Sequence, residues 1–218
     1  MFDFNKVKVI GVTQPVVDFI PDSEGILSYA ARVSSPPNQE NFDTAGKLLA
    51  YCVKHKHYSV FETCSLTMEI ETPRDIARQI LRHRSFSFQE FSQRYAQSTN
   101  FIQRECRLQD TKNRQNSLEC FDEDTAHVWK IMQQELLDVA EKNYQQALDI
   151  GIAKEVARTL LPEGLTMSKM YMQGSVRSWI HFVKVRDDEG VAQKEVVDVA
   201  RKAKAELLKY FPCLVEVI

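Results

Sequence analysis

The sequence lacks any apolar run of the roughly 18 residues that a membrane-spanning helix needs. Its first residues carry no basic stretch followed by an apolar segment, as an export signal would. The five cysteines are scattered and never form a C-x-x-C pair, so neither a disulfide framework nor a zinc ribbon is indicated. We therefore expect a protein of a reducing cytoplasm with no membrane partner.

Linker-like Gly/Ser stretches, internal repeats and low-complexity segments are also missing from the sequence. A chain of 218 residues with 44% hydrophobic and 27% charged residues is therefore expected to form one globular domain over 1–218. Its net charge of -2 lacks the basic excess typical of a surface that holds a long nucleic-acid backbone. No nucleic-acid partner is expected, and an anionic ligand must be bound by a local concentration of basic residues.

Hydrophobic periodicity predicts a helix-rich fold with few strands. Apolar and polar residues alternate in 6–12 and 65–72, as they do in half-buried strands. Helical spacing and capping residues predict helices at 23–33, 42–56, 122–151, 153–161, 175–185 and 189–209, and one more opened by Thr72 as N-cap and Pro73 at the first helical position. Within 96–120 only a strand at 101–108 is suggested. The predicted class is α+β, with a small mixed or antiparallel sheet.

The predicted helix over 122–151 is amphipathic and about 40 Å long. Its apolar positions include Val128, Met132, Leu136 and Val139. So long a helix often packs on another subunit as well as on its own core. We therefore expect the protein to form a homo-oligomer.

Arginine is concentrated in one part of the chain. Between residues 74 and 94 five arginines stand against two acids, a local charge of +3. Arg74, Arg78 and Arg82 repeat at i+4 steps, and such like-charge pairs each cost a few tenths of a kcal/mol unless an anion or an acid compensates. Gln79, Arg82 and His83 would share one face of the same helix. The arginines alone fit a solvated basic face as well as an anion-binding site.

The segment 85–95 combines hydroxyls, amides, a carboxylate and a guanidinium with large aromatic side chains. Guanidinium groups bind phosphate oxygens in a bidentate manner, and an amide such as Gln89 can match the edge of a nucleobase. Aromatic faces can line a flat ring system. Taken singly, Phe86, Phe88 and Phe91 fit a place in the core better than contact with a ligand. The whole segment nevertheless favours a site over a solvated face.

The segment 82–94 resembles R-H-R-x2-S-x-N-x2-S-x-R, the signature of the flavin-dependent thymidylate synthases. Six of its seven fixed positions agree, namely Arg82, His83, Arg84, Ser87, Ser92 and Arg94. The departure is Gln89, which keeps the amide of the motif's Asn but reaches one methylene further.

Three other segments resemble the same family. Residues 57–62 look like its H-x-[ST]-x-F-E segment, 155–162 like its E-x-A-R-x-x-L-P segment, and 174–186 like the segment that ends at its second nucleotide-binding arginine. Without the family, His55 and His57 would suggest a metal pair, but no third ligand follows at a useful spacing and no metal is expected.

The arginines of these segments also have simpler interpretations. Arg158 would be an i+3 partner of Glu155 on a helix. Arg186 would be a cation that offsets the dipole at a helix C-terminus. The resemblance favours ligand contact for both arginines.

The resemblance implies reductive methylation of dUMP to dTMP. Methylenetetrahydrofolate would supply the carbon, NADPH the reducing equivalents, and bound FAD would mediate. It also implies a homotetramer with shared active sites, in which Ser59 would act on the flavin of a neighbouring subunit.

The family's functional residues carry over to matching positions of this chain. The positions implied at FAD are His57, Ser59, Arg82, His83, Arg84, Glu90, Ser175, Arg177 and His181. The positions implied at dUMP are Gln79, Arg82, Glu90, Ser92, Gln93, Arg94, Arg158 and Arg186. Arg186 is the expected catalytic residue, because a preorganised guanidinium that stabilises negative charge on the pyrimidine oxygens makes C5 of uracil a better nucleophile.

Three other functions fit parts of the sequence. A single-stranded nucleic-acid binder would use the arginines and phenylalanines of 82–95, although the near-neutral charge disfavours it. A histidine phosphatase would need glycine where Arg84 stands. A purely structural oligomer built on the helix over 122–151 would leave the clustered arginines without a purpose.

Overall fold

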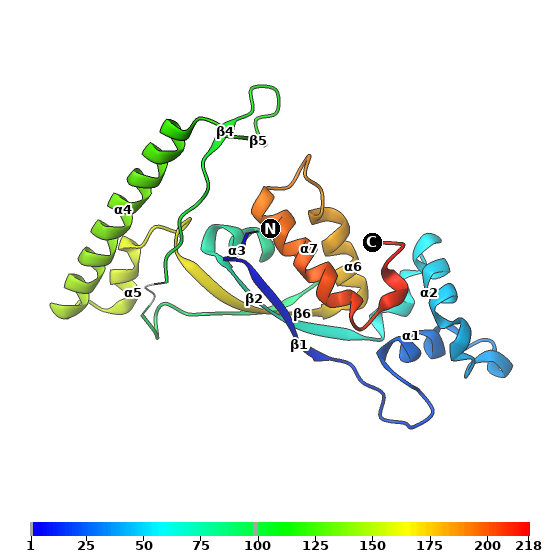
Figure 1. The fold of residues 1–218 in the computed structure, drawn as a ribbon. Coiled ribbons are helices and arrows are strands. Elements are labelled where there is room, and N and C mark those ends of the chain that lie inside the picture. Colours follow the sequence, from blue (N-terminus) through cyan, green and yellow to red (C-terminus); the bar gives the residue numbers. More distant parts are fainter. Residues whose placement is uncertain (1, 98–99) are drawn as a thin grey trace.

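The computed structural model describes residues 2–97 and 100–218 (Figure 1). Its strands are β1 (Lys6–Val12), β2 (Ser65–Pro73), β3 (Ser87–Glu90), β4 (Arg107–Gln109), β5 (Ser117–Glu119) and β6 (Met167–Ser175). Its α-helices are α1 (Ser23–Ala31), α2 (Ala45–Lys54), α3 (Arg74–Ile80), α4 (Glu123–Asp149), α5 (Lys154–Ala157), α6 (Val176–Arg186) and α7 (Lys194–Leu208). Short 3-10 helices are η1 (Pro36–Asn38), η2 (Phe42–Thr44), η3 (Tyr58–Glu62), η4 (Arg158–Leu160) and η5 (Pro212–Leu214). Within the two described ranges, no helix has the length and apolar content to cross a membrane.

The main sheet is antiparallel and has the strand order β1-β2-β6-β3. β2 and β6 pair along their whole length. Leu66, Met68 and Ile70 alternate on β2 and are buried, because α6 and α7 cover this face of the sheet (Figure 1). A second sheet is the short hairpin of β4 and β5. The mixture of helices with a small antiparallel sheet confirms the predicted α+β class.

The long helix α4 stands away from the main sheet and packs on α5 and η4 (Figure 1). Asp122 caps it by accepting a hydrogen bond from the backbone N of Thr125 at 3.1 Å. Gly151 follows its end with a φ of 88°, which an L-residue rarely adopts. Buried Gln133 donates to the carbonyl O of Arg104 at 3.0 Å and accepts from its backbone N at 2.7 Å. The helix predicted over 122–151 is confirmed.

The helix after β2 differs from its prediction at both ends. Thr72 is not the N-cap but a strand residue paired with Ser168, and its Oγ1 donates to Asn5 Oδ1 at 2.8 Å. Pro73 takes the N-cap position instead. At the other end α3 stops at Ile80, so Arg82 and His83 do not share a helical face with Gln79. Thr72 and Pro73 pair with β6, so their backbone is not available to a helix that begins at these residues.

Two strands next to the predicted site were not predicted. β3 lies within the polar segment 85–95, and the sequence pattern predicts no element over β6. On β6 the buried positions Met170, Met172 and Gly174 do alternate, but a glycine and flanking polar residues weaken the apolar pattern. The strand predicted at 101–108 is wrong for most of its length, since only a bridge from Phe101 to Thr166 and the start of β4 are formed.

The ring of Phe86 lies directly over Gly174 of β6. A Cβ built on Gly174 would stand 2.6 Å from Phe86 Cε1, far inside van der Waals contact. The same ring packs edge-on against Trp179 of α6, with 4.8 Å between the ring centroids. Glycine at 174 therefore allows the segment between α3 and β3 to reach the core.

We predict that Gly174→Ala lowers the free energy of unfolding by about 1–3 kcal/mol, because the added methyl group overpacks Phe86 and must displace it. Urea denaturation measures the change. Gly11→Ala is the matched control, since a Cβ there would meet nothing closer than Thr67 Cβ at 3.8 Å and should leave stability unchanged or raised. Equal effects of the two substitutions would contradict the role assigned to Gly174.

Candidate active site

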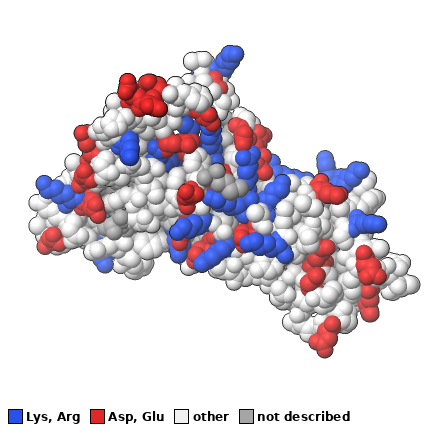
Figure 2. Space-filling model, viewed as in Figure 1, with Lys and Arg blue, Asp and Glu red and all other residues white. Residues whose placement is uncertain are grey.

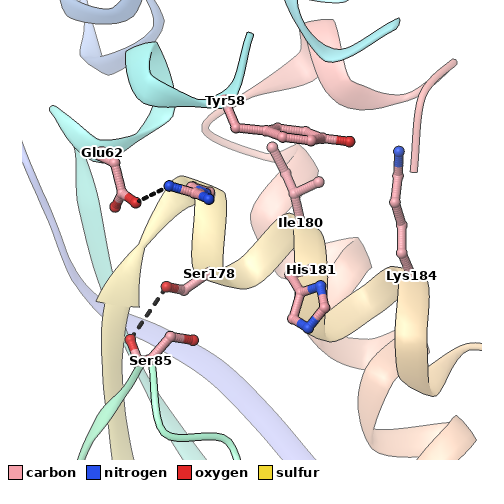
Figure 3. Close-up of a pocket in the computed structure, with 8 residues that line it drawn as sticks. Tyr58, Glu62, Ser85, Ser178, Ile180, His181 and Lys184 are labelled. Carbon is pink, nitrogen blue, oxygen red and sulfur yellow. Dashed lines mark hydrogen bonds and ion pairs between the residues drawn. The ribbon is translucent and has the colours of Figure 1, made fainter. Parts of the chain in front are cut away.

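A cavity of about 460 Å³ lies beside the first two turns of α6, and we call it the α6 cavity (Figure 3). Its lining residues are Tyr58 and Glu62 from η3, Ser85 from the segment before β3, and Arg177, Ser178, Ile180, His181 and Lys184 from α6. Apolar surface and a few convergent polar groups are typical of a small-molecule site, and the volume lies in the usual range of about 300–1,000 Å³.

Serine hydroxyls hold the start of α6 in place. Ser175 Oγ accepts a hydrogen bond from the backbone N of Ser178 at 3.3 Å and caps the helix. Ser178 Oγ donates to the carbonyl O of Ser85 at 3.2 Å, which ties the segment before β3 to α6 (Figure 3). Arg177 Nη1 forms an ion pair with Glu62 at 3.0 Å. Both of these charged side chains are half exposed, so this ion pair adds little stability and can be exchanged for another anion.

The end of α6 meets the segment after α3 through two side chains. Arg186 Nε donates to His83 Nε2 at 2.8 Å, and the imidazole packs edge-on against Phe182 with 5.0 Å between the centroids. The bond requires Nε2 to carry no hydrogen, so His83 is neutral with its proton on Nδ1. Burial, followed by the charges of Arg186, His181 and Arg82, lowers the pKa of His83 to about 4.

Arg186 is held in a fixed orientation by this contact. Burial, and then the charge of Arg82, lower the pKa of its guanidinium from the ordinary value. Its Nη1 and Nη2 groups form no hydrogen bond with any residue in 2–97 or 100–218. The planar end of the guanidinium can therefore bind a ligand while Nε stays on His83.

A second pair of arginines meets at Glu155. Arg94 Nε forms an ion pair with Glu155 Oε2 at 3.2 Å, and Arg158 Nε donates to the carbonyl O of Glu155 at 3.2 Å. The sequence predicted that Arg158 and Glu155 pair at i+3 on a helix. The two residues are in contact, but Arg158 binds the backbone carbonyl O of Glu155 rather than its carboxylate. Two guanidinium groups that contact the same residue lie close enough together to bind one phosphate.

Glu90 is the last residue of β3, and Gln93 directly precedes Arg94. Glu90 Oε1 accepts from Ser168 Oγ at 2.7 Å and pairs with Arg74 Nη1 at 3.4 Å. Gln93 is buried, and its Nε2 has no hydrogen-bond partner in the described part of the chain. A buried donor without a partner is costly, so this amide is available to a ligand.

The other predicted positions lie at the edges of these groups. His57 is exposed and precedes η3, and Ser59 is exposed on η3; neither lines the α6 cavity. Gln79 Nε2 donates to Gln193 Oε1 at 2.7 Å. Arg82 and Arg84 are exposed, and Ser92 is half-buried.

The predicted residues gather in two places rather than one. His83, Ser175, Arg177, His181 and Arg186 lie at the Ser87 end of β3, whereas Glu90, Ser92, Arg94 and Arg158 lie at or beyond its Glu90 end. Three residue steps along β3 span about 10 Å. A single chain therefore does not collect all predicted site residues around one cavity.

Several residues of these groups were not predicted as site residues. Lys184, Ser178, Ser85 and Tyr58 line the α6 cavity, and Ser168 holds Glu90. Glu62 and Tyr58 lie inside the segment 57–62, so that resemblance contained a signal for them. Ser168 has none, because only the pairing of β3 with β6 brings it to Glu90.

Charge on the face shown in Figure 2 is interleaved rather than gathered in one basic track. Across the sheet Lys8 pairs with Glu69 at 2.9 Å and Lys169 with Glu71 at 2.9 Å. Among the residues that the structure describes, no group of three or more His, Cys, Asp or Glu is placed to hold a metal ion.

Comparison with known proteins identifies relatives along almost the whole chain. The family described as thymidylate synthase complementing protein matches residues 15–213. A flavin-dependent thymidylate synthase of Synechocystis sp. is 49% identical over 209 residues, which cover 94% of this chain and 95% of that protein. A protein of Paramecium bursaria Chlorella virus 1 named "Probable flavin-dependent thymidylate synthase" is 46% identical over 212 residues, 97% of each chain.

A solved structure agrees with these relatives. The UMP/dUMP methylase PolB from Streptomyces cacaoi, bound with 5-Br dUMP, is similar with a TM-score of 0.80 and 27% identity, covering 98% of this chain and 93% of that one. These matches favour the enzymatic interpretation over a single-stranded nucleic-acid binder.

We predict that His83 makes stability depend on pH. Above about 6.5 the imidazole is neutral in the folded and the unfolded chain alike. As the pH falls from about 6.5 to about 4, the unfolded chain takes up a proton at His83 while the folded chain does not, so the free energy of unfolding decreases. Below about 4 both states carry the proton and the dependence ends.

Urea denaturation at pH 6.5 and near pH 4.5 tests this expectation. The loss of stability between the two pH values should be smaller in His83→Gln than in the wild type. The control is His127→Gln, which removes an exposed histidine of α4 and should keep the wild-type loss. An unchanged loss in His83→Gln would contradict the buried neutral imidazole.

Proposed function

Because the chain belongs to the flavin-dependent thymidylate synthase family, we propose that it converts dUMP to dTMP by reductive methylation. Methylenetetrahydrofolate provides the carbon, NADPH the reducing equivalents, and FAD is the cofactor. The observation that carries the proposal is the bond between Arg186 and His83, which joins the segment 174–186 to the motif 82–94. These are the two parts of the chain that resemble the family most directly.

The α6 cavity suits part of a flavin nucleotide. Arg177, Lys184 and the serine hydroxyls offer donors for phosphate and ribityl oxygens, and Tyr58 and Ile180 offer apolar surface. FAD, when bound, supplies the redox chemistry between the nicotinamide and the one-carbon unit. The chain's own task is to bind and orient it, with Ser175, Arg177 and His181 on α6 and His83 and Arg84 on the opposing segment.

Arg186 activates the pyrimidine in this proposal. Its free Nη groups donate to the oxygens of uracil, where negative charge develops as C5 becomes nucleophilic. Nε remains on His83, so the guanidinium need not reorganise when that charge forms. Donors of this kind are worth about 3 kcal/mol in related reactions. Gln79 on α3 and Arg82, which directly precedes His83, complete the contacts with the nucleotide.

Arg94 and Arg158 bind the phosphate of dUMP. Their contacts with Glu155 support this role, because they hold the two guanidinium groups near each other, and a dianionic phosphate competes well for Arg94 against one exposed carboxylate. Ser92 adds a hydroxyl donor, and the unpartnered amide of Gln93 supplies another. Glu90, oriented by Ser168 and Arg74, borders both the nucleotide and the flavin.

The chain functions as one domain over 1–218 in a homotetramer with shared active sites. Two observations support this assembly. The two groups of site residues lie at opposite ends of β3, which spans about 10 Å, and can be completed by a neighbouring copy. Ser59 and His57 are exposed and do not line the α6 cavity, so they are available to the flavin of a neighbour.

The apolar surface of α4 supports the assembly as well. Val128, Met132, Leu136 and Val139 form a stripe at i, i+4, i+8 and i+11, and we call it the α4 stripe. Each of these side chains is at least 50% exposed. An exposed contiguous apolar stripe of this length is typical of a surface that another protein covers.

We predict that the purified protein binds FAD, shows visible flavin absorption and loses it on anaerobic addition of NADPH. Arg186→Lys should keep both properties but form dTMP at least a hundredfold more slowly, because a lysine cannot donate from Nε to His83 and from two Nη groups to uracil together. Single-turnover assays measure dTMP. Arg114→Lys, an exposed change in the β4–β5 turn, is the matched control.

A wild-type protein that binds no FAD and forms no dTMP would overturn the function. Near-normal turnover in Arg186→Lys with FAD bound would overturn only the role given to Arg186.

We also predict that Met132→Glu lowers the assembly state seen by light scattering and reduces dTMP formation in the same samples, because a carboxylate in the α4 stripe must be desolvated in the interface. Lys130→Glu is the control on the opposite side of the helix and should leave the assembly intact. A tetramer that survives Met132→Glu, or a dissociated chain with full activity, would refute the shared site.

A further inference from the structure

A second cavity, of about 650 Å³, adjoins the α6 cavity and has no role in the proposed reaction so far. The two cavities share Tyr58 and Lys184, and in Figure 3 the ring of Tyr58 extends toward Lys184. We call the second one the lysine cavity. Lys54 from the end of α2, Lys56 from the following turn and Lys184 from α6 line it. A ligand bound in the lysine cavity can therefore contact a ligand bound in the α6 cavity.

The charge of the lysine cavity is not neutralised within the chain. Lys54, Lys56 and Lys184 are exposed, and none of them forms an ion pair with an acid in 2–97 or 100–218. Glu216 is the one carboxylate among the lining residues. Three cations around a cavity with one acid, in a chain whose net charge is -2, favour an anionic ligand.

The backbone at Lys56 supports a role for its side chain. Lys56 has a φ of 61° and is the one residue other than glycine with positive φ among those described. It follows the end of α2, where His57 N donates to the carbonyl O of Cys52 at 2.8 Å. Glycine is the favoured residue at this position, and Gly151 fills the equivalent place after α4. A lysine kept in an unfavourable conformation indicates that its ammonium group is needed there.

We propose that the lysine cavity binds the anionic tail of a co-substrate whose ring system lies against the flavin nucleotide of the α6 cavity. This inference rests on the proposed function, which supplies a suitable ligand, since the folate carries a flexible tail of glutamate carboxylates. Lysine ammonium groups on separate flexible stems can each pair with a different carboxylate of such a tail. A single planar guanidinium is less suited to a chain of carboxylates. Phosphate groups of the nicotinamide co-substrate share the same anionic chemistry.

Equilibrium binding measurements distinguish the folate carboxylates from the nicotinamide phosphates as the ligand, and they do not require turnover. Calorimetry should compare methylenetetrahydrofolate with one glutamate against the form with several glutamates, and NADPH against NADH, on the FAD-bound protein. The wild type should bind the longer folate about tenfold more tightly, as expected for two partly exposed ion pairs. This preference should fall as salt is added.

The double variant Lys54→Ala/Lys56→Gly should lose that preference and bind the one-glutamate folate as the wild type does. Lys56→Gly should be at least as stable as the wild type in urea, because glycine is favoured at a φ of 61°. Lys47→Ala is the matched control, since Lys47 is exposed on the same helix but does not line the cavity.

Each outcome decides the proposal. Loss of the tail preference supports the site with the folate carboxylates as its ligand, and loss of a preference for NADPH over NADH supports it with a phosphate. Unchanged affinities for all four ligands would overturn it. A wild type that shows the lysine-dependent preference but forms no dTMP would overturn the proposed function and leave the site in place.

Discussion

The contact of Phe86 with Gly174 is the constraint on which the candidate site depends. With no side chain at 174, the ring enters the core and packs on Trp179. The segment between α3 and β3 is thereby pressed against α6, and His83 comes within hydrogen-bonding distance of Arg186. The neutral imidazole follows from the same packing, because burial beside guanidinium groups disfavours a second positive charge.

Charge plays a different part on the other side of the molecule. Glu195 of α7 is fully buried and pairs with Arg104 at 2.9 Å and Arg107 at 2.5 Å. These bonds, with the side chain of Gln133, attach the segment before β4 to α7 and α4. The segment is thus ordered by polar contacts rather than by an apolar face, and α4 is left with its stripe exposed. This exposed stripe supports the assembly proposed through α4.

Periodic segments were predictable from the sequence and irregular ones were not. β1, α4 and the cap of α6 by Ser175 carry alternation, helical spacing or a capping hydroxyl, and all were predicted. β3 and β6 carry weaker patterns because polar residues and Gly174 interrupt them. Arg82 and His83 were placed on a helix because spacing alone does not reveal that α3 ends at Ile80.

The chemistry available to this protein is evident from its residue order, since the residues in 82–94 and 174–186 indicate the family. Which of those groups meet depends on the tertiary structure. Arg186 reaches His83 across 103 positions of the chain, and Arg94 meets Arg158 only at Glu155. Contacts so distant depend on strand pairing and on the packing of Phe86, which no local pattern encodes.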